Sequence, residues 1–434
     1  MINLLRKYKT ILTVAMKKKI CLFEDAGTEN FLPLTYTRPV YELLFGISTL
    51  REKIISYFPQ SPIILHTRKF LEAHLKEMNP ALSVNNFTGN EILFINGRLL
   101  IDKNLSGEIK KLTPNSSLVD SEGVVLAACM SGDKIASLNN DTGDYIDFSG
   151  LDEKRIDLRT GNLLKYLWDL ISSNEDEIEN DFKRLTKLRR KSSPRRFSNV
   201  VFNNRKNIFI SKNCSIDPFV YLDASTGPIY IDENVQIMSH CFIQGPAYIG
   251  KNSTVKNGAV IYHGTSIGEM CKVGGEIENS IIHSFSNKQH GGFLGHAYLG
   301  SWINFGADTN NSDLKNNYEN ISVLLNGKPV NTGLQFLGLI MGDHSKTAIN
   351  TMFNTGTIVG VSCNIFGSGF PPRYIPSFSW GGSDFLRTYD LSKSLDVAKI
   401  VYGRRGKFFA ETDEKVLTDV FEMTRNERGR KSGQ

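Results

Sequence analysis

The chain has 434 residues, of which 40% are hydrophobic and 22% are charged, the composition of a folded soluble protein. Its length favours two or three domains over one core, and no window approaches ~18 uninterrupted apolar residues, so we expect no membrane span. The six cysteines are widely spread without a Cys-x-x-Cys pair. This usage predicts reduced, mostly buried thiols in a cytoplasmic protein, and excludes a disulfide or zinc framework.

The net charge of +6 has a local source. Residues 183–196 hold eight basic residues and no acidic one, while the rest of the chain carries 43 basic against 45 acidic residues. A nucleic-acid tail is usually longer or interleaved with aromatic residues. We therefore expect a solvated helix end and linker here, and no nucleic-acid partner.

Residues 1–15 are short, basic and mildly apolar, without a cleavage site after a proper apolar core, so we expect a dispensable extension. Residues 16–160 alternate strand and helix patterns, which predicts an α/β domain with a parallel sheet. The expected strands are 20–23, 62–66, 91–96 and 123–129, and the expected helices lie within 40–58 and at 69–78.

Ligands bind at the carboxyl ends of strands in such sheets. The strand 20–23 runs into Glu24-Asp25, the strand 91–96 runs into Gly97-Arg98, and several cations follow the first strand. These cations could bind a polyphosphate, or they are surface charges on a loop and a helix. The candidate nucleotide-binding residues are Asp25, Arg38, Arg51, Lys53, Asn96 and Arg98.

Residues 161–200 are predicted to link two domains. We expect one helix from about Gly161 to Arg190, in which Trp168 serves packing, followed by the basic linker.

From Ile210 onward, an aliphatic residue recurs every six positions, with a small or β-branched residue four positions later, as in Ile210/Cys214 and Ile249/Ser253. A period of six is neither helical nor a simple strand alternation. It fits short strands joined by tight corners, three to a coil, with coils stacked at about 4.8 Å. Residues 201–369 are therefore predicted to form a left-handed parallel β-helix. A β-sandwich, the alternative, would show period-two alternation.

The repeat pauses at 279–294 and at 310–339, which predicts two loops projecting from corners of the coil. Because one coil presents a flat face, we expect sites between subunits, where one chain's loop covers a neighbour. Beyond Gly369 the repeat ends at Pro371-Pro372, and residues 370–434 are predicted to be a helical tail with helices at 391–398 and 413–425.

The stretch Asn287–Thr309, NKQHGGFLGHAYLGSWINFGADT, resembles the acetyltransferase domain of the GlmU family of N-acetylglucosamine-1-phosphate uridylyltransferases/glucosamine-1-phosphate acetyltransferases. The family pattern there is K-x-G-H-x-x-Y-L-G-x-A-x-I-G-x-x-x-N-x-G-A-x-T. The domain order, α/β then helix then β-helix, is also similar. Residues 31–40, 50–53 and 310–316 resemble a divergent GlmU-like group of sugar nucleotidyltransferases, and the resemblance covers roughly residues 17–370.

The resemblance places His290 on the family's catalytic histidine. An imidazole titrating near neutrality can accept the proton of a sugar amine that attacks the thioester of acetyl-CoA directly. The resemblance implies sugar-phosphate contacts for Lys256, Phe293, Asn304 and Lys315. It assigns acetyl-CoA binding to Ala307, Ser345 and Thr347, and Arg404, Arg405 and Lys407 could reach the phosphates of coenzyme A or be solvated surface.

The sequence departs from the family at several of these positions. Phe293 replaces a tyrosine, Lys256 stands for an arginine, and Glu278 stands where the family has a lysine. The family's glycine-rich nucleotide loop is absent after the first strand, where only Gly27 stands. A phosphate would be repelled by Glu24 and by the neighbouring Asp25 unless Mg²⁺ lies between them.

We therefore predict a bifunctional enzyme of amino-sugar nucleotide synthesis. It would acetylate an amino-sugar-1-phosphate with acetyl-CoA and couple a sugar-1-phosphate to a UTP-like nucleoside triphosphate with Mg²⁺, as a homotrimer. One alternative is an acyltransferase whose first domain only binds nucleotide-sugar. Another is a non-enzymatic trimeric scaffold, against which the glycine-flanked loop around His290 argues.

Overall fold

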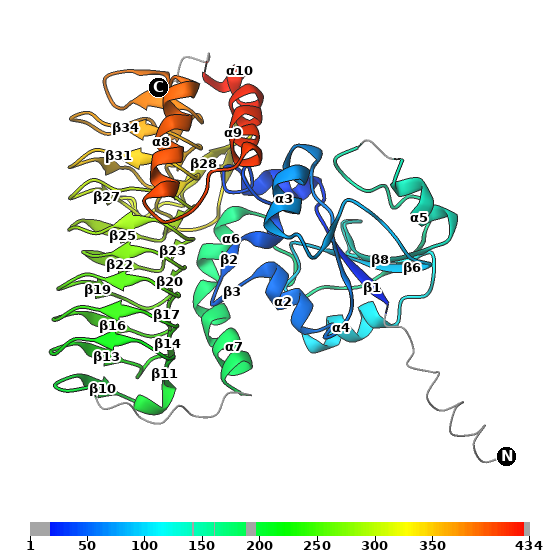
Figure 1. The fold of residues 1–434 in the computed structure, drawn as a ribbon, viewed down its shortest axis with the longest axis horizontal. Helices are drawn as coiled ribbons and strands as arrows, with labels where there is room; N and C mark the ends of the chain where they lie inside the picture. The colour runs from blue at the N-terminus through cyan, green and yellow to red at the C-terminus, as the bar shows by residue number, and fades with distance from the viewer. Residues whose placement is uncertain (1–17, 141–142, 160, 188–196, 429–434) are drawn as a thin grey trace. The chain divides into compact units, whose positions relative to one another are not determined.

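The computed structural model describes residues 18–140, 143–159, 161–187 and 197–428. The basic stretch expected at 183–196 therefore lies mostly outside the described residues, as does the extension 1–15. The chain divides into two compact units, of which the first holds residues up to 26 and 51–163, and the second holds 27–50 and everything from 164 onward. Figure 1 shows the secondary structure of both.

The first unit is built on a seven-stranded sheet in the order β5-β4-β1-β6-β8-β7-β9. Strands β5, β4, β1 and β6 are parallel, β8 is antiparallel to β6 and to β7, and β9 is parallel to β7. The strands are β1 (Lys19–Phe23), β4 (Ile63–Leu65), β5 (Ser83–Val84), β6 (Glu91–Asn96), β7 (Ser116–Val119), β8 (Val125–Ser131) and β9 (Asp152–Arg155). The helices are α2 (Leu50–Ser56), α3 (Glu72–Met78), α4 (Lys103–Lys110) and α5 (Asp133–Leu138).

The central strands β1 and β6 are nearly continuous buried apolar runs, as expected for strands covered on both faces. The chain goes from β1 to β4 and β5 on one side, and then crosses to β6 on the other side of β1. The carboxyl ends of β1 and β6 therefore form a topological switch point, where α/β sheets bind ligands. The α/β prediction is confirmed, although β5, β7 and β9 were not expected.

The second unit is dominated by strands of two or three residues that wind into a three-sided left-handed coil (Figure 1). Within each sheet, partner residues are typically 18 positions apart, as in Ile231, Ile249 and Ile267, so one coil equals three hexads. The hexad prediction is thus confirmed. The inward residues of the regular coils are almost entirely buried, and each such aliphatic side chain contributes roughly 1.5–3 kcal/mol.

The three faces of the coil are named here for the argument that follows. Face one contains β11 (Ile208–Ile210), β14 (Ile229–Ile231), β17 (Ala247–Ile249), β20 (Thr265–Ile267), β23 (Ile281–Ile282), β26 (Tyr298–Leu299), β30 (Ile340–Met341), β33 (Ile358–Val359) and β35 (Tyr374–Ile375). Face two contains β12 (Ser215–Ile216), β15 (Gln236–Ile237), β18 (Thr254–Val255), β21 (Lys272–Val273), β24 (Asn287–Lys288), then β31 (Lys346–Thr347), β34 (Asn364–Ile365), β36 (Ser379–Gly381) and β37 (Leu386–Thr388). Face three contains β10 (Val201–Asn203), β13 (Tyr221–Asp223), β16 (Phe242–Gln244), β19 (Val260–Ile261), β22 (Glu276–Glu278), β25 (Phe293–Gly295), then β27 (Asn310–Asn311) and β32 (Met352–Phe353).

The predicted loop at 279–294 is wrong. These residues form a shortened coil in which β23, β24 and β25 pair with β20, β21 and β22, as in Ser266↔Ile281 and Glu276↔Phe293. The pattern misled because the inward positions are Ile282, Lys288 and Leu294, so a lysine takes an aliphatic position. The second predicted loop is a genuine insertion after β27 and contains the hairpin of β28 (Ser322–Leu325) and β29 (Lys328–Asn331).

The linking segment contains two helices, α6 (Leu167–Ser172) and α7 (Asn174–Thr186), and not the single helix expected from Gly161 to Arg190. The chain leaves helical geometry at Ser173, where φ is −111°. Helix α7 packs on face one, since the Asn174 amide donates to Gly264 O at 2.8 Å and to Ser266 Oγ at 3.0 Å. Trp168 is buried, as the packing interpretation expected.

Residues 27–50 form a strap along face one, although the sequence placed them with the α/β domain. The strap contains the short elements η1 (Ala26–Phe31), η2 (Val40–Glu42), β2 (Leu44–Phe45) and β3 (Ser48–Thr49). Three side chains of face one bond its backbone: Ser266 Oγ donates to Gly46 O at 2.7 Å, Tyr298 OH to Leu44 O at 3.0 Å, and His283 Nε2 to Glu42 O at 3.0 Å. The outward residues in the middle of face one, such as Ser266 and Tyr298, are therefore buried.

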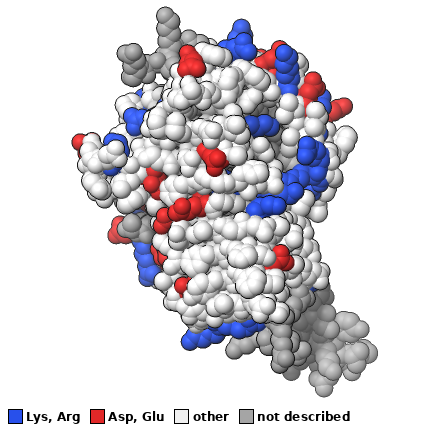
Figure 2. All heavy atoms as spheres, turned by 90° about the vertical axis from the view of Figure 1, so that its left-hand side faces the viewer, with Lys and Arg blue, Asp and Glu red and all other residues white. Residues whose placement is uncertain are grey.

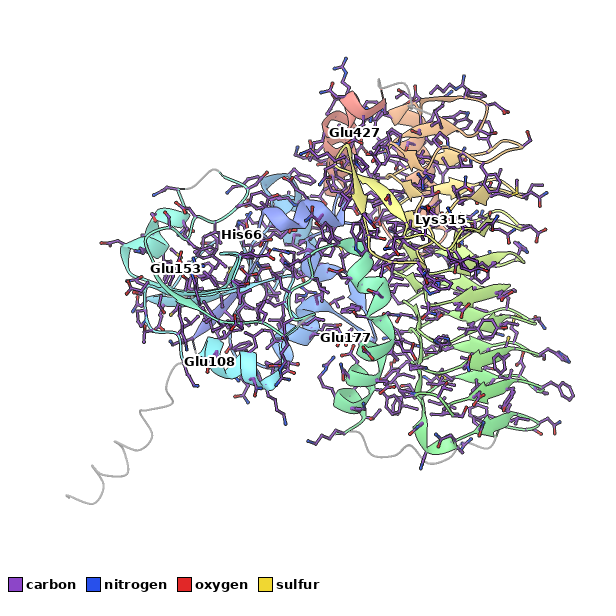
Figure 3. All side chains as sticks on the ribbon, turned by 180° about the vertical axis from the view of Figure 1, so that it is seen from behind. His66, Glu108, Glu153, Glu177, Lys315 and Glu427 are labelled. Atoms are coloured by element: carbon purple, nitrogen blue, oxygen red, sulfur yellow. The ribbon has the colours of Figure 1, made fainter. Side chains whose placement is uncertain are left out.

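The coil continues past residue 369, because β35 and β36 still pair in register with β33 and β34. Pro371-Pro372 lie in the connection between strands and do not end the coil. The predicted helices follow as α8 (Leu391–Gly403), α9 (Glu411–Met423) and α10 (Arg425–Arg428). Glu427, labelled in Figure 3, accepts from Tyr374 OH at 2.7 Å. Within the described residues, every helix is too short or too polar to cross a membrane.

Candidate functional sites

His290 lies exposed at the corner between β24 and β25, where face two turns into face three. The corner needs its glycines: Gly292 has φ +101°, and a Cβ there would collide with Thr309 O of the next coil. A Cβ on Gly291 would lie 2.7 Å from Asp308 Oδ1. The glycines therefore let the next coil approach closely beneath an accessible imidazole.

Ala307 lies beside His290 in the next coil. Asn287 of β24 forms a bridge with Asn304, so three residues further along both coils His290 faces Ala307. The structure therefore brings together the predicted base and the residue expected near the thioester. Lys256 lies on the same edge two coils earlier, in the file that runs from Lys256 through Gly274 to Gln289.

Two further predicted sugar-contacting residues flank this corner. Phe293 faces outward on face three, and its N–H donates to Asn310 Oδ1 at 2.7 Å. Asn304 is exposed on face two and accepts from Asn287 Nδ2 at 3.3 Å. Figure 2 views the side of the coil where face three lies, and most of that surface is uncharged.

Lys315, labelled in Figure 3, lies in the insertion after β27. Its ammonium donates to Asn320 O at 2.9 Å, within its own loop.

Ser345 and Thr347, assigned to acetyl-CoA from the sequence, turn into the coil interior. Ser345 Oγ donates to Gly360 O at 2.7 Å and accepts from Cys363 N at 2.9 Å. Thr347 Oγ1 lies 2.7 Å from Thr309 Oγ1. Their hydroxyls serve the packing of the coil, which removes them from contact with a ligand.

A column of aromatic rings lies at the corner between faces one and two. Trp302 stacks between Phe285, at 4.3 Å between ring centroids, and Tyr402 of α8, at 4.0 Å. The guanidinium of Arg405 donates to Asn287 Oδ1 at 2.6 Å, and the Lys407 ammonium lies 5.6 Å from the Phe285 ring. The tail thus brings two of the cations considered from the sequence to the edge of face two.

In the first unit, three predicted nucleotide-binding residues meet at the switch point. Arg98 Nε donates to Asp25 Oδ1 at 2.8 Å, and Asn96 Nδ2 donates to Asp25 Oδ2 at 2.8 Å. Asp25 follows β1, and Asn96 ends β6, so parallel strand ends bring them together.

Glu24, the other acidic residue that follows β1, is also neutralised. Arg68, after β4, bonds Glu24 through Nε and Nη2 at 3.3 Å each, and Thr67 Oγ1 donates to Glu24 Oε2 at 2.9 Å. The expected repulsion of phosphate by Glu24 and Asp25 is therefore offset by two arginines.

The carboxylates that would hold Mg²⁺ are engaged in these pairs, so this arrangement does not fit a metal ion held by the protein itself. Through the described part of the chain, no group of three or more His, Cys, Asp or Glu residues could ligate one.

The remaining predicted cations lie apart from this cluster. Arg51 and Lys53 are on α2, where Arg51 Nη1 donates to Asn79 Oδ1 at 2.7 Å. Arg38 belongs to the strap of the second unit, forms an ion pair with Asp343, and donates to Ser301 Oγ at 3.2 Å. The Arg38 guanidinium therefore neutralises Asp343 within the β-helix unit.

A small pocket opens at the carboxyl ends of β4 and β5, where His66 is labelled in Figure 3. Sequence reasoning missed it because its residues are scattered along the chain. It is lined by His66, Lys69, Asn85, Phe87, Tyr145 and Ile146, among others.

Residues 20–190 match the family model described as sugar nucleotidyl transferase, and residues 228–263 match bacterial transferase hexapeptide repeats. A bifunctional sugar-1-phosphate nucleotidylyltransferase/acetyltransferase from Sulfurisphaera tokodaii is 30% identical over 32% of this chain and 35% of its own. Proteins named bifunctional GlmU from Methanocaldococcus jannaschii and Synechococcus elongatus are 33% and 27% identical over 24% and 37% of this chain, and 25% and 31% of their own.

The matched parts span about a third of each relative or less. The two family matches nevertheless fall separately, on the α/β region with its linking helices and on the coil. Residues 20–190 are therefore similar to sugar nucleotidyl transferases and residues 228–263 to hexapeptide-repeat transferases, the two activities that the names of the bifunctional relatives combine.

Proposed function

We propose that the chain is a bifunctional enzyme of amino-sugar nucleotide synthesis. The β-helix unit transfers acetyl from acetyl-CoA to the amine of an amino-sugar-1-phosphate such as glucosamine-1-phosphate. The α/β unit transfers a nucleotidyl group, uridylyl in our proposal, to the sugar-1-phosphate. The observation that carries the proposal is the exposed imidazole of His290 on a glycine corner, with Ala307 in the adjoining coil.

In the acetyl transfer, the neutral sugar amine attacks the thioester carbonyl. A carbon–nitrogen bond forms, the carbon–sulfur bond breaks, and His290 takes the amine proton and returns it to the departing thiolate. Backbone N–H groups of the coil can stabilise the developing oxyanion. In this proposal Lys256, Phe293, Asn304 and Lys315 contact the sugar phosphate, and Ala307 borders the thioester.

The active assembly is a homotrimer in this proposal. One coil presents a nearly flat surface, and in this proposal the mostly exposed strand β29 of the inserted hairpin covers a neighbouring subunit.

In the nucleotidyl transfer, a phosphate oxygen of the sugar-1-phosphate attacks the α-phosphorus of the nucleoside triphosphate, and pyrophosphate leaves. The ends of β1 and β6 place Arg98, fixed by Asp25 and beside Asn96, where the sheet topology puts a ligand. Arg98 and Arg68 neutralise Asp25 and Glu24 there, so the triphosphate meets no uncompensated negative charge at these strand ends. Arg51 and Lys53 lie apart from this cluster on α2, and in this proposal they contribute no direct phosphate contact there.

One alternative has structural support. The acids after β1 are paired with arginines, and the glycine-rich phosphate loop is absent, which also suits a first unit that binds nucleotide-sugar without turnover. Pyrophosphate release from UTP and N-acetylglucosamine-1-phosphate separates the two. We expect pyrophosphate from the full chain, with thiol release from acetyl-CoA and glucosamine-1-phosphate. Thiol release without pyrophosphate would support the alternative, and absence of both would refute the proposal.

A further inference from the structure

Lys288 is a charged residue at an inward-facing position of the β-helix. Its file on face two reads Ile216, Ile237, Val255, Val273 and then Lys288, each paired with the next in register. The lysine is 2% exposed, so its side chain lies where the preceding coils place aliphatic groups.

All three protons of the Lys288 ammonium are used in hydrogen bonds to backbone carbonyls. Nζ donates to Gly274 O at 2.8 Å, to Gly292 O at 2.7 Å and to His290 O at 3.2 Å. Gly274 lies in the equivalent corner of the preceding coil. The ammonium therefore ties together two adjacent corners, and one of its bonds goes to the peptide carbonyl of His290 itself.

The next coil holds the corner containing His290 through side-chain hydrogen bonds and not through backbone pairing. The corner therefore needs additional support from within its own coil. The N–H groups of Phe293 and Gly295 donate to the side chains of Asn310 and Asn311, at 2.7 and 3.1 Å. Strand β25 ends the six-stranded sheet of face three, while β27 pairs with β32. The segment 289–295 thus lies at a break in the regular ladder.

An aliphatic side chain would satisfy the coil at this position, as it does in the four preceding coils. Burying an ammonium instead carries a desolvation cost, and burial lowers the pKa of Lys288 to about 8, against the opposing effect of Asp308 and Glu276. Residues that break a folding rule in this way are expected at functional sites.

We propose that Lys288 is a positioning residue for acetyl transfer, which fixes the carbonyls of His290 and Gly292 against the preceding coil so that the imidazole is held toward the sugar amine. This inference rests on the proposed function of the β-helix unit. It differs from a purely structural role because it predicts a defect in the chemical step and not in acetyl-CoA binding.

The test uses the full chain with acetyl-CoA and glucosamine-1-phosphate, following thiol release. Lys288→Met, which keeps the length but has no donor, should lower kcat at least tenfold with the KM for acetyl-CoA within twofold of wild type. Lys288→Gln keeps two N–H donors, so its kcat should lie between those of the wild type and Lys288→Met. Ile237→Val, a change in the same inward file far from the corner, should leave kcat within twofold and serves as the packing control.

A pH profile gives a readout that packing alone would not move. Above about pH 8 the ammonium loses a proton and one of its three carbonyl bonds, so wild-type kcat should decline there. Lys288→Met should lack that decline. The charged or titratable groups near Lys288 are Lys256, Glu276, His290 and Asp308.

The outcomes separate this inference from the proposed function. If His290→Ala abolishes thiol release while Lys288→Met keeps kcat within twofold, the inference is overturned and the proposed function stands. If His290→Ala keeps the wild-type rate, both are overturned. Should Lys288→Met fail to fold, Lys288→Gln and the wild-type pH profile decide: kcat flat from pH 7 to 10 would overturn the inference.

Discussion

At the scale of single residues, the corner of His290 depends on backbone freedom at Gly292. Its φ of +101° disfavours any side chain, and a Cβ would also strike Thr309 O. Gly258 is the matched control, because it lies in a corner between the same two faces with φ +68° and has nothing within 4 Å of a Cβ.

We predict that Gly292→Ala lowers the free energy of unfolding by about 3 kcal/mol, since strain and collision add, while Gly258→Ala costs about 1 kcal/mol from strain alone. Chemical denaturation of both variants measures this. Equal losses in the two would show that the close approach of the next coil is not rigid.

Lys288 also predicts a pH dependence of stability. Its folded pKa of about 8 is below the ordinary value of 10.5, so between these values the unfolded chain binds more protons than the folded one. Stability contributed by this group therefore rises with pH through that window, and below about pH 8 the cost of burying the ammonium is present in full.

The wild type should accordingly gain up to about 3 kcal/mol relative to Lys288→Met between pH 8 and 10.5. Denaturant unfolding of both proteins at intervals across this range measures the gain. Burial also lowers the pKa of Lys346 to about 8, but Lys346 is present in both proteins, so its contribution cancels in the difference between them. A difference that is constant with pH would contradict the burial of a charged ammonium at residue 288.

At the scale of elements, the strap 27–50 is a structural part of the β-helix unit. Arg38 pairs with Asp343, Thr37 Oγ1 donates to Asp343 Oδ2 at 2.9 Å, and the carboxylate also accepts the N–H of Ser301 at 2.9 Å. Asp343 is 3% exposed, so removing one partner leaves an uncompensated buried charge.

We expect Arg38→Met to lower the free energy of unfolding of the β-helix unit by about 3 kcal/mol or more. Arg51→Met, a change of the same kind in the first unit, is the control and should cost less than about 1 kcal/mol. If Arg38→Met instead left stability unchanged and raised the KM for the nucleoside triphosphate, the nucleotide role expected from the sequence would be favoured.

These elements show what local sequence could predict. The hexad period predicts the coil because each inward residue repeats the same environment every six positions. It misread 279–294 as a loop because Lys288 is polar, although its stem and its bonds to three carbonyls suit the interior. Residues 27–50 carry no period, so their place is revealed by contacts with residues 128 to 254 positions away.

At the scale of the whole molecule, the two candidate sites lie in separate units. The switch-point cluster of Asp25, Asn96 and Arg98 lies entirely in the first unit, and the His290 corner lies entirely in the second. Strand ends and a local motif made both clusters predictable. The pairing of Arg68 with Glu24 could not be predicted from the sequence, because it joins strand ends 44 positions apart and no motif marks it.

We therefore expect Arg98→Met to lower pyrophosphate release at least tenfold, because it removes the cation fixed at the switch point, while thiol release stays within twofold. Assaying both products on one preparation measures this, with Arg155→Met, an exposed arginine on β9, as the control. Equal loss of both activities would indicate unfolding or coupling between the units, and no loss of either would remove Arg98 from the nucleotide site.

The most direct test of the account is thiol release from acetyl-CoA and glucosamine-1-phosphate by His290→Ala. General-base catalysis contributes about 10²–10⁴-fold, so the rate should fall at least 100-fold with the unfolding midpoint unchanged. His240→Ala is the matched control, since His240 is also exposed at a corner between faces two and three, and it should keep the wild-type rate. A wild-type rate in His290→Ala would contradict the account.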